Sequence, residues 1–365
     1  MTDALHWLQT STPGLLLLCL LAIAVLLFLV IKVKLEPFIA LFVSGMGLAV
    51  IAGLSVKDMV GTALKSDKSI LETGFGGILG HITIIIGLGT VLGSLLERSG
   101  GADVLARRLI KLFGPRGTPV AMGLLGLIFG IPVFFDIGIF VLAPLVYVAA
   151  QRGGRSLVLY ALPVLAGLSM THAFLPPHPG PTAVAGLLGV DLGWLIAMGV
   201  LCGLPAFAAA GILYPVWIAK RIDVRVPADF LAAESADDDE SEKDAKPPVS
   251  LTLVITLILI PLLLILSATF GTMILEPGGV LSFLTFVGNP AVALTVAVLL
   301  AYWFLGIRRG MSRDEIAGFT GASLRPIGMI LLVVGAGAFF GAVISATGVG
   351  EALAGVLSRA GLPVL

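Results

Sequence analysis

The chain has 365 residues, of which 58% are hydrophobic and 12% are charged, and its formal net charge is zero. Soluble globular proteins carry about 25% charged residues, so the composition excludes that class and indicates a polytopic α-helical membrane protein. A zero net charge gives no case for nucleic-acid binding, and the two cysteines, Cys19 and Cys202, both lie in apolar segments, which argues against a disulfide framework.

Apolar segments follow one another along the chain. A helix needs about 20 predominantly apolar residues to cross a membrane. Segments that meet this need are 14–31, 37–54, 75–96, 194–218, 251–270, 290–306 and 323–346. Two further stretches, 118–150 and 156–188, are hydrophobic but interrupted. The first segment lacks the basic start and the cleavage site of a signal peptide, so we expect a retained helix.

Basic residues set the orientation of a multi-pass protein because they stay on the cytoplasmic side. With the N-terminus outside, the inner loops hold all but four of the 22 lysines and arginines. The four exceptions are Lys57, Lys65, Lys68 and Arg359. Both ends of 118–150 are then cytoplasmic, which predicts a re-entrant hairpin with its turn at 130–138. The stretch 156–188 has to cross fully, because no basic residue separates it from 194–218.

Four prolines interrupt the stretch 156–188. They are Pro176, Pro177, Pro179 and Pro181. A proline lacks a backbone N–H and clashes with the preceding turn, so we expect a non-helical break across residues 171–181. At membrane depth, such backbone occurs only inside protein or beside a water-filled cavity. Because this break also contains His172 and His178, it is typical of a transporter's binding site.

One carboxylate, Asp136, lies deep inside an apolar stretch, at the tip of the predicted hairpin. A buried carboxylate binds a proton more readily than one in water, which suits a proton carrier. The alternative is a helix cap, because Asp136 follows two phenylalanines at a turn.

Histidines and threonines in the broken helix are the other candidates. Histidine exchanges a proton near neutral pH, so His172 and His178 are expected to carry protons or to complement a carboxylate. The alternative is a neutral histidine bonded to backbone that the prolines leave unpaired. Thr171 and Thr182 either donate to substrate oxygens or cap the broken helix ends. No lysine or arginine lies within a predicted span, so an anionic substrate would depend on helix N-termini, hydroxyl groups and histidine.

Two hydrophilic or amphipathic segments complete the pattern. Residues 223–250 are rich in aspartate and glutamate and are expected to form a solvated cytoplasmic linker. The stretch Ala102–Phe113 is amphipathic and is expected to lie flat at the cytoplasmic interface.

A repeat relates the two halves of the chain. Gly87, Gly89, Gly93, Gly100, Leu105, Ala106 and Leu109 recur 248 residues later as Gly335, Gly337, Gly341, Gly348, Leu353, Ala354 and Leu357. By the charge pattern the two copies cross in opposite directions, as in the inverted repeats of secondary transporters. This predicts a first repeat at 1–222, the linker at 223–250 and a second repeat at 251–365. Because Leu365 corresponds to Gly117, nothing matches the hairpin or the broken helix, and we expect a truncated second repeat.

Several of these motifs resemble one known family. The segments are 74–80, 87–89, 96–102, 130–138 and 171–183. They are similar to the gluconate permease family of proton symporters. The resemblance implies uptake of gluconate or a related sugar acid with protons across a bacterial inner membrane, by a possible homodimer with moving transport domains. Family members continue past the point that corresponds to Leu365, through a Gly-Ser-Ala-Thr segment that this sequence lacks.

We therefore predict an all-α, proton-coupled sugar-acid transporter with its substrate between the hairpin tip and the broken helix. The residues expected to contact the substrate are Pro132, Phe135, Asp136, Thr171, His172, Pro177, His178, Gly180 and Thr182. The expected partners are the lipid bilayer, the sugar acid and protons, with no cofactor, no metal and no catalytic group, because the sequence contains no set of residues typical of an enzyme. Two alternatives remain: a transport-inactive remnant or subunit of such a permease, and a sodium-coupled carboxylate transporter.

Overall fold

A computed structural model describes residues 2–61, 68–226 and 249–359 of the chain. The described residues form helices and no strand, which confirms the predicted all-α class. They divide into two compact units, one made of Met1–Thr83 with Pro326–Leu365 and the other of Ile84–Arg325. Most of the predicted linker 223–250 lies outside the described residues.

Eight helical segments in the described part of the chain are long and apolar enough to cross a membrane, as a multi-pass protein requires. They are Thr12–Ile31, Glu72–Arg98, Gly101–Gly130, Val158–Leu188, Leu192–Ile218, Leu251–Ile274, Pro290–Arg309 and Arg313–Ala346. The segment predicted at 37–54 forms a shorter helix, Pro37–Ile51, of 15 residues. The segment predicted at 323–346 forms a helix from Ile327 to Ala346. Its first two residues belong to the preceding helix, which ends at Leu324.

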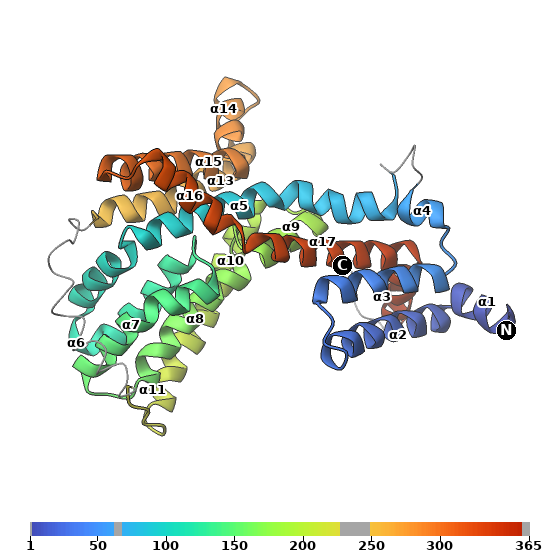
Figure 1. Ribbon diagram of the computed structural model, residues 1–365, viewed down its shortest axis with the longest axis horizontal. Coiled ribbons are helices and arrows are strands. Elements are labelled where there is room, and N and C mark those ends of the chain that lie inside the picture. The colour runs from blue at the N-terminus through green and yellow to red at the C-terminus, as the bar shows by residue number, and fades with distance from the viewer. Residues whose placement is uncertain (1, 62–67, 227–248, 360–365) are drawn as a thin grey trace. The chain divides into compact units, whose positions relative to one another are not determined.

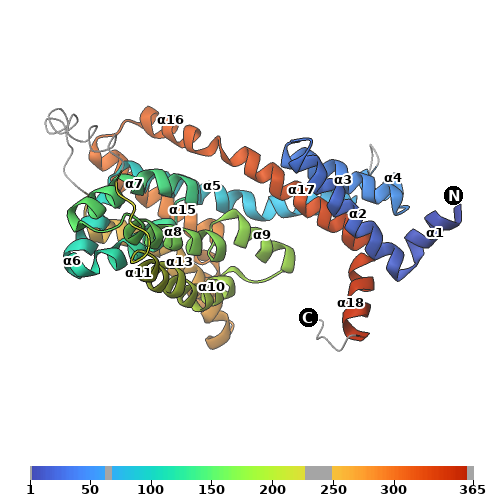
Figure 2. The same cartoon turned by 90° about the horizontal axis from the view of Figure 1, so that it is seen from below.

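The first unit is built around α2 (Thr12–Ile31), α3 (Pro37–Ile51) and α17 (Ile327–Ala346), and α17 packs against α3 (Figures 1 and 2). The fully buried ring of Phe339 lies in their common core. Gly45 permits this contact, because a methyl group there would lie 3.0 Å from the ring of Phe339. The other elements of this unit are α1 (Thr2–Thr10), α4 (Val56–Val60), the π-helical η1 (Glu72–Gly76), the start of α5 and α18 (Val349–Arg359).

The second unit has two apolar cores. The first core joins α5 (Gly77–Arg98), α10 (Leu192–Phe207), α13 (Leu251–Ile274) and α15 (Pro290–Ala301). Asp191 fixes the start of α10, since its Oδ1 accepts from the N–H groups of Gly193 and Trp194 and from the hydroxyl of Thr269 on α13. The smaller elements are η2 (Ala208–Leu213), α11 (Tyr214–Ile218), α14 (Gly279–Val287), η3 (Tyr302–Gly306), η4 (Ile307–Arg309) and α16 (Arg313–Leu324).

The second core joins α6 (Gly101–Gly130), α7 (Phe135–Gly153) and α8 (Val158–Phe174), which lie side by side (Figure 1). Glycines let α6 and α8 approach closely, as small residues do in membrane helix pairs. A methyl group at Gly126 would meet the carbonyl oxygen of Val164, and one at Gly130 would meet the hydroxyl of Thr171. This crossing therefore brings the end of α6 to the end of α8.

Both predicted interruptions are present but shorter than expected. The break between α6 and α7 covers residues 131–134, so Phe135 to Gly138 belong to a helix and not to the turn. The break between α8 and α9 (Pro179–Leu188) covers residues 175–178. Pro179 and Pro181 are helical because the first turn of a helix needs no intrahelical N–H donor, so a proline there removes nothing.

The helices α5 and α17 end 248 residues apart, which is the offset of the predicted repeat. α5 ends at Arg98 and Gly100 has a φ of 75°, while α17 ends at Ala346 and Gly348 has a φ of 78°. Glycine is the residue that adopts positive φ without steric cost. The two positions thus share a local conformation, and their inverted relationship stays a prediction.

Candidate functional site

The two chain breaks of the second unit meet beside α5. Pro177 in the break after α8 packs on Gly89 of α5, where a methyl group would overlap the proline ring. One turn further along, the backbone carbonyl of Pro132 lies against Gly93, where a methyl group has no room either. Both breaks therefore pack on one face of α5, at two glycines four residues apart. The turn between α6 and α7 thus lies next to the break between α8 and α9.

His178 is the residue that joins the two breaks directly. It lies just before α9, is only 2% exposed, and its Nε2 is 2.7 Å from the carbonyl oxygen of Gly130 at the end of α6. Because a carbonyl only accepts, Nε2 carries the hydrogen, and Nδ1 is the nitrogen that can take up a further proton. The last carbonyls of a helix lack partners within the helix, so this bond also satisfies one end of α6.

His178 also belongs to a cluster of four rings. The ring centroids of His172 and His178 are 4.7 Å apart, and the ring of Phe134 is in T-shaped contact with both histidines, at centroid distances of 6.3 and 5.8 Å. Phe135, the first residue of α7, lies 6.2 Å from His172. The structure therefore brings the two predicted histidines into contact and adds Phe134, which the sequence prediction did not include.

The two threonines differ in their hydrogen bonds, although both are fully buried. The Thr171 hydroxyl donates to the carbonyls of Gly167 and Leu168 in its own helix, at 3.2 and 3.0 Å. The hydroxyl of Thr182 has no hydrogen-bond partner among the described residues. Buried polar groups are nearly always paired, so a hydroxyl without a partner next to a chain break is a candidate ligand contact.

Gly180 offers a backbone donor in the same place. In the first turn of α9, Pro179 and Pro181 have no N–H, and the N–H of Thr182 is bonded to the carbonyl of His178. The N–H of Gly180 is thus the one that remains for an outside acceptor. Gly180 is exposed, and apart from its own helix backbone and chain neighbours no described residue comes within 4 Å of the position a methyl group would take.

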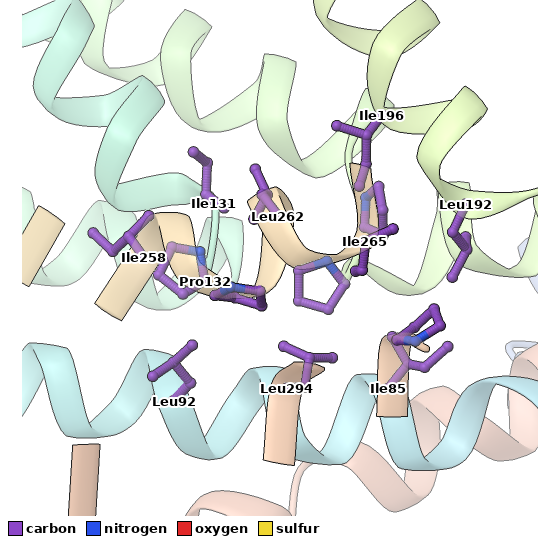
Figure 3. A pocket seen from close by; sticks show the side chains of 14 residues that line it. Ile85, Leu92, Ile131, Pro132, Leu192, Ile196, Ile258, Leu262, Ile265 and Leu294 are labelled. Atoms are coloured by element: carbon purple, nitrogen blue, oxygen red, sulfur yellow. The ribbon is translucent and has the colours of Figure 1, made fainter. Parts of the chain in front are cut away.

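Pro132 and Pro177 face an apolar cavity instead of polar groups. The cavity is lined by the residues shown in Figure 3, among them Ile85 and Leu92 of α5 on one side and Ile258 and Ile265 of α13 on the other. Its volume of about 20 Å³ leaves room for about one water molecule. A hydroxylated anion does not fit there, so these two prolines hold the breaks in place and their predicted contact with substrate gains no support from this cavity.

The remaining predicted residue is Asp136, which is the second residue of α7. Its side chain lies outside the described residues. The residues that the sequence prediction missed are Phe134, Gly89 and Gly93. The glycines carry a signal, because small residues four apart mark a close helix contact, whereas nothing in the sequence separates Phe134 from Phe135.

Comparisons with known proteins identify the family. The inner membrane permease YgbN of Escherichia coli (strain K12) is 38% identical over 361 residues, covering 97% of this chain and 77% of the relative. The gluconate permease of Pseudomonas aeruginosa is 36% identical over 340 residues, covering 93% and 73%. The D-serine transporter DsdX of Escherichia coli (strain K12) is 33% identical over 342 residues, also covering 93% and 73%.

A family-wide comparison agrees with these relatives, since the GntP family permease pattern matches residues 14–365. The resemblance seen in the sequence motifs is thus confirmed over nearly the whole chain. The chain belongs to the GntP family of permeases.

Proposed function

We propose that this chain takes up a sugar acid of the gluconate class together with protons, and that the two chain breaks around His178 form its binding site. As a GntP permease with relatives named as permeases and transporters, it is a multi-pass membrane transporter and not an enzyme. The observation that carries the proposal is the contact between His172 and His178, with centroids 4.7 Å apart, where the breaks meet.

Recognition of the substrate carboxylate rests on helix N-termini. α7 and α9 both begin at the breaks, and the N-terminal end of a helix carries partial positive charge and free N–H groups. In α9 the available donor is the N–H of Gly180, with the unpaired hydroxyl of Thr182 in the same turn. One carboxylate and several hydroxyl groups match such a set of neutral donors better than a multiply charged anion does.

Proton coupling rests on the histidine pair. Two imidazolium ions this close would repel each other strongly in a buried site, so the pair holds one proton at a time. A substrate carboxylate beside the pair stabilises that proton, and departure of the proton weakens the hold on the substrate. Asp136, at the start of α7, is a second candidate for the proton carrier.

The test uses the purified chain in liposomes. Uptake of radiolabelled gluconate is measured with an imposed pH gradient in sodium-free buffer, then with a sodium gradient, and each time with a protonophore. The proposal expects accumulation with the pH gradient that the protonophore abolishes. Accumulation that needs sodium and resists the protonophore would establish sodium coupling instead, and no uptake of any kind would contradict transport by this chain.

Competition identifies the substrate class. Unlabelled sugar acids that share a carboxylate and neighbouring hydroxyl groups are added in turn, together with D-serine, because one relative is named for that amino acid. Strong competition by sugar acids and weak competition by D-serine is expected. The opposite order would assign the chain to amino-acid transport.

A further inference from the structure

A second cavity lies apart from the histidine site, between the first half of α6 and the end of α7. α6 bends at Gly114, where φ is 66°, and the bend opens a space of about 530 Å³. Volumes of this size are typical of small-molecule sites. The lining residues are Ala106, Arg107, Ile110, Lys111, Gly114, Pro115, Thr118, Leu145, Val148, Ala149, Arg152 and Gly153.

Three basic side chains line this cavity. Arg107 and Lys111 lie four residues apart on one face of α6, and Arg152 lies in the last turn of α7. None of them forms an ion pair within the described part of the chain, and no acidic residue lines the cavity there. Three like charges around one space repel one another, so an anion that enters this cavity relieves the repulsion.

Most of the rest of the wall is apolar, with Thr118 as a polar exception. Ile110 on α6 and Leu145, Val148 and Ala149 on α7 line the cavity together with the cations. A free inorganic anion gains nothing from such a surface, whereas an amphiphile places its acyl chains on it. The ligand that fits both parts has an anionic head and an apolar tail.

Exposed apolar side chains next to the cavity point to a membrane surface. On the same turn of α6, Leu112 is 72% exposed and Phe113 is 39% exposed, beside Lys111. Large apolar residues alternating with basic residues are typical of helices that lie in the lipid headgroup region. The cavity mouth is thus placed where phospholipid headgroups occur.

We propose that this cavity binds the headgroup phosphate of an anionic glycerophospholipid, with Arg107, Lys111 and Arg152 as its ligands and the apolar wall holding the start of an acyl chain. Basic pockets between membrane helices are a recognised way to bind such headgroups. The site is separate from the histidine pair and would exist whatever substrate the chain carries.

The experiment measures lipid binding to the purified chain in detergent. Short-chain phosphatidylglycerol, the matching phosphatidylcholine and glycerol phosphate are titrated separately, and binding is followed by native mass spectrometry. The test variant is Lys111→Gln with Arg152→Gln. The control is Arg108→Gln with Arg116→Gln, which removes the same charge from exposed residues of α6 that do not line the cavity.

Phosphatidylglycerol is expected to bind more tightly than the other two probes. The test pair should lower that affinity about tenfold or more, since each basic residue near a membrane surface contributes about fivefold, while the control pair changes it by less than about twofold. If the double variant does not fold, the single variant Arg152→Gln replaces it, because Arg152 is exposed. We expect this variant to lower the affinity for phosphatidylglycerol about fivefold.

Two outcomes would overturn the assignment. Equal losses in the test and control pairs would mean that the cations act as a diffuse basic surface and not as a site. Equal affinity for glycerol phosphate and phosphatidylglycerol would mean that the cavity binds a free anion and that the apolar wall plays no part.

Discussion

His178 makes two contacts that point to different roles. Its Nε2 donates to the carbonyl of Gly130, and its ring lies against that of His172. The first contact is what a purely structural histidine would make, and the second is what a proton-binding pair would need. Substitutions that keep one contact and remove the other separate the two roles.

Glutamine at position 178 is the informative change. His178→Ala leaves the Gly130 carbonyl buried without its donor, so we expect a loss of about 1–3 kcal/mol in unfolding free energy. His178→Gln can donate from its side-chain amide and is expected to restore the thermal midpoint in detergent. It cannot bind a proton at neutral pH, so gluconate uptake should no longer follow an imposed pH gradient. Normal proton-driven uptake by His178→Gln would assign His178 a structural role alone.

Substitution of Thr182 tests whether the candidate site binds substrate. Its buried hydroxyl has no partner among the described residues, and valine has nearly the same shape. Thr182→Val removes an unpaired polar group, so we expect stability to be unchanged or slightly raised. If the hydroxyl bonds to substrate, KM for gluconate should rise by about 2- to 10-fold, as expected for one lost hydrogen bond.

A matched control for this change is Thr90→Val on α5. Thr90 is also buried, but its hydroxyl donates to the carbonyl of Ile86 in its own helix. We expect little change in KM there. Thr182→Val with an unaltered KM and lower stability would place the Thr182 hydroxyl in a structural role.

At the scale of elements, α5 is the support on which the site is assembled. Pro177 packs on Gly89, and the backbone of Pro132 packs on Gly93. One face of α5 therefore sets the distance between two breaks that lie far apart in sequence. Both contacts depend on the absence of a side chain at the glycine.

Alanine substitutions along α5 test this support. Gly93→Ala would push a methyl group into a backbone carbonyl, and Gly89→Ala would push one into a proline ring, so each is expected to cost about 1–3 kcal/mol and to reduce uptake. Gly87→Ala is the control, because the nearest atom, on Leu324, would be 3.8 Å away. Alanine favours helix over glycine, so this variant should melt at the same or a higher temperature. Equal melting temperatures and uptake in all three variants would show that the breaks do not rest on α5.

At the scale of the whole molecule, the distribution of basic residues predicts the arrangement of the chain across the membrane. We predict an external N-terminus and a cytoplasmic loop after α11. His6 and Lys220 are exposed residues in these two regions.

Cysteine labelling checks this orientation. In a variant with Cys19 and Cys202 replaced by alanine, His6→Cys should react with a membrane-impermeant maleimide in intact cells. Lys220→Cys should react only after the membrane is opened, because the basic loops stay inside. The reverse pattern would contradict the orientation and, with it, the re-entrant course of 118–150.

Much of the architecture could be read from the sequence because its causes are local. Runs of apolar residues determine which segments form membrane-spanning helices, since a backbone surrounded by lipid has to form all its hydrogen bonds within the protein. Prolines fix where the chain breaks, although the breaks came out shorter because Pro179 and Pro181 fit into the first turn of α9. The family could also be recognised from motifs of a few residues each, and the match extends over residues 14–365.

The contacts of the site were decided only by the tertiary structure. His172 and His178 are six positions apart in a proline-rich segment, and nothing local sets the distance between their rings. The partner of His178 is a carbonyl 48 residues away, reached because glycines let α6 and α8 cross closely. The sequence by itself determined membrane-spanning helices with proline-rich breaks, since hydropathy and proline act along the chain. The pairing of two histidines at a helix end depended on packing between distant segments, which no local pattern encodes.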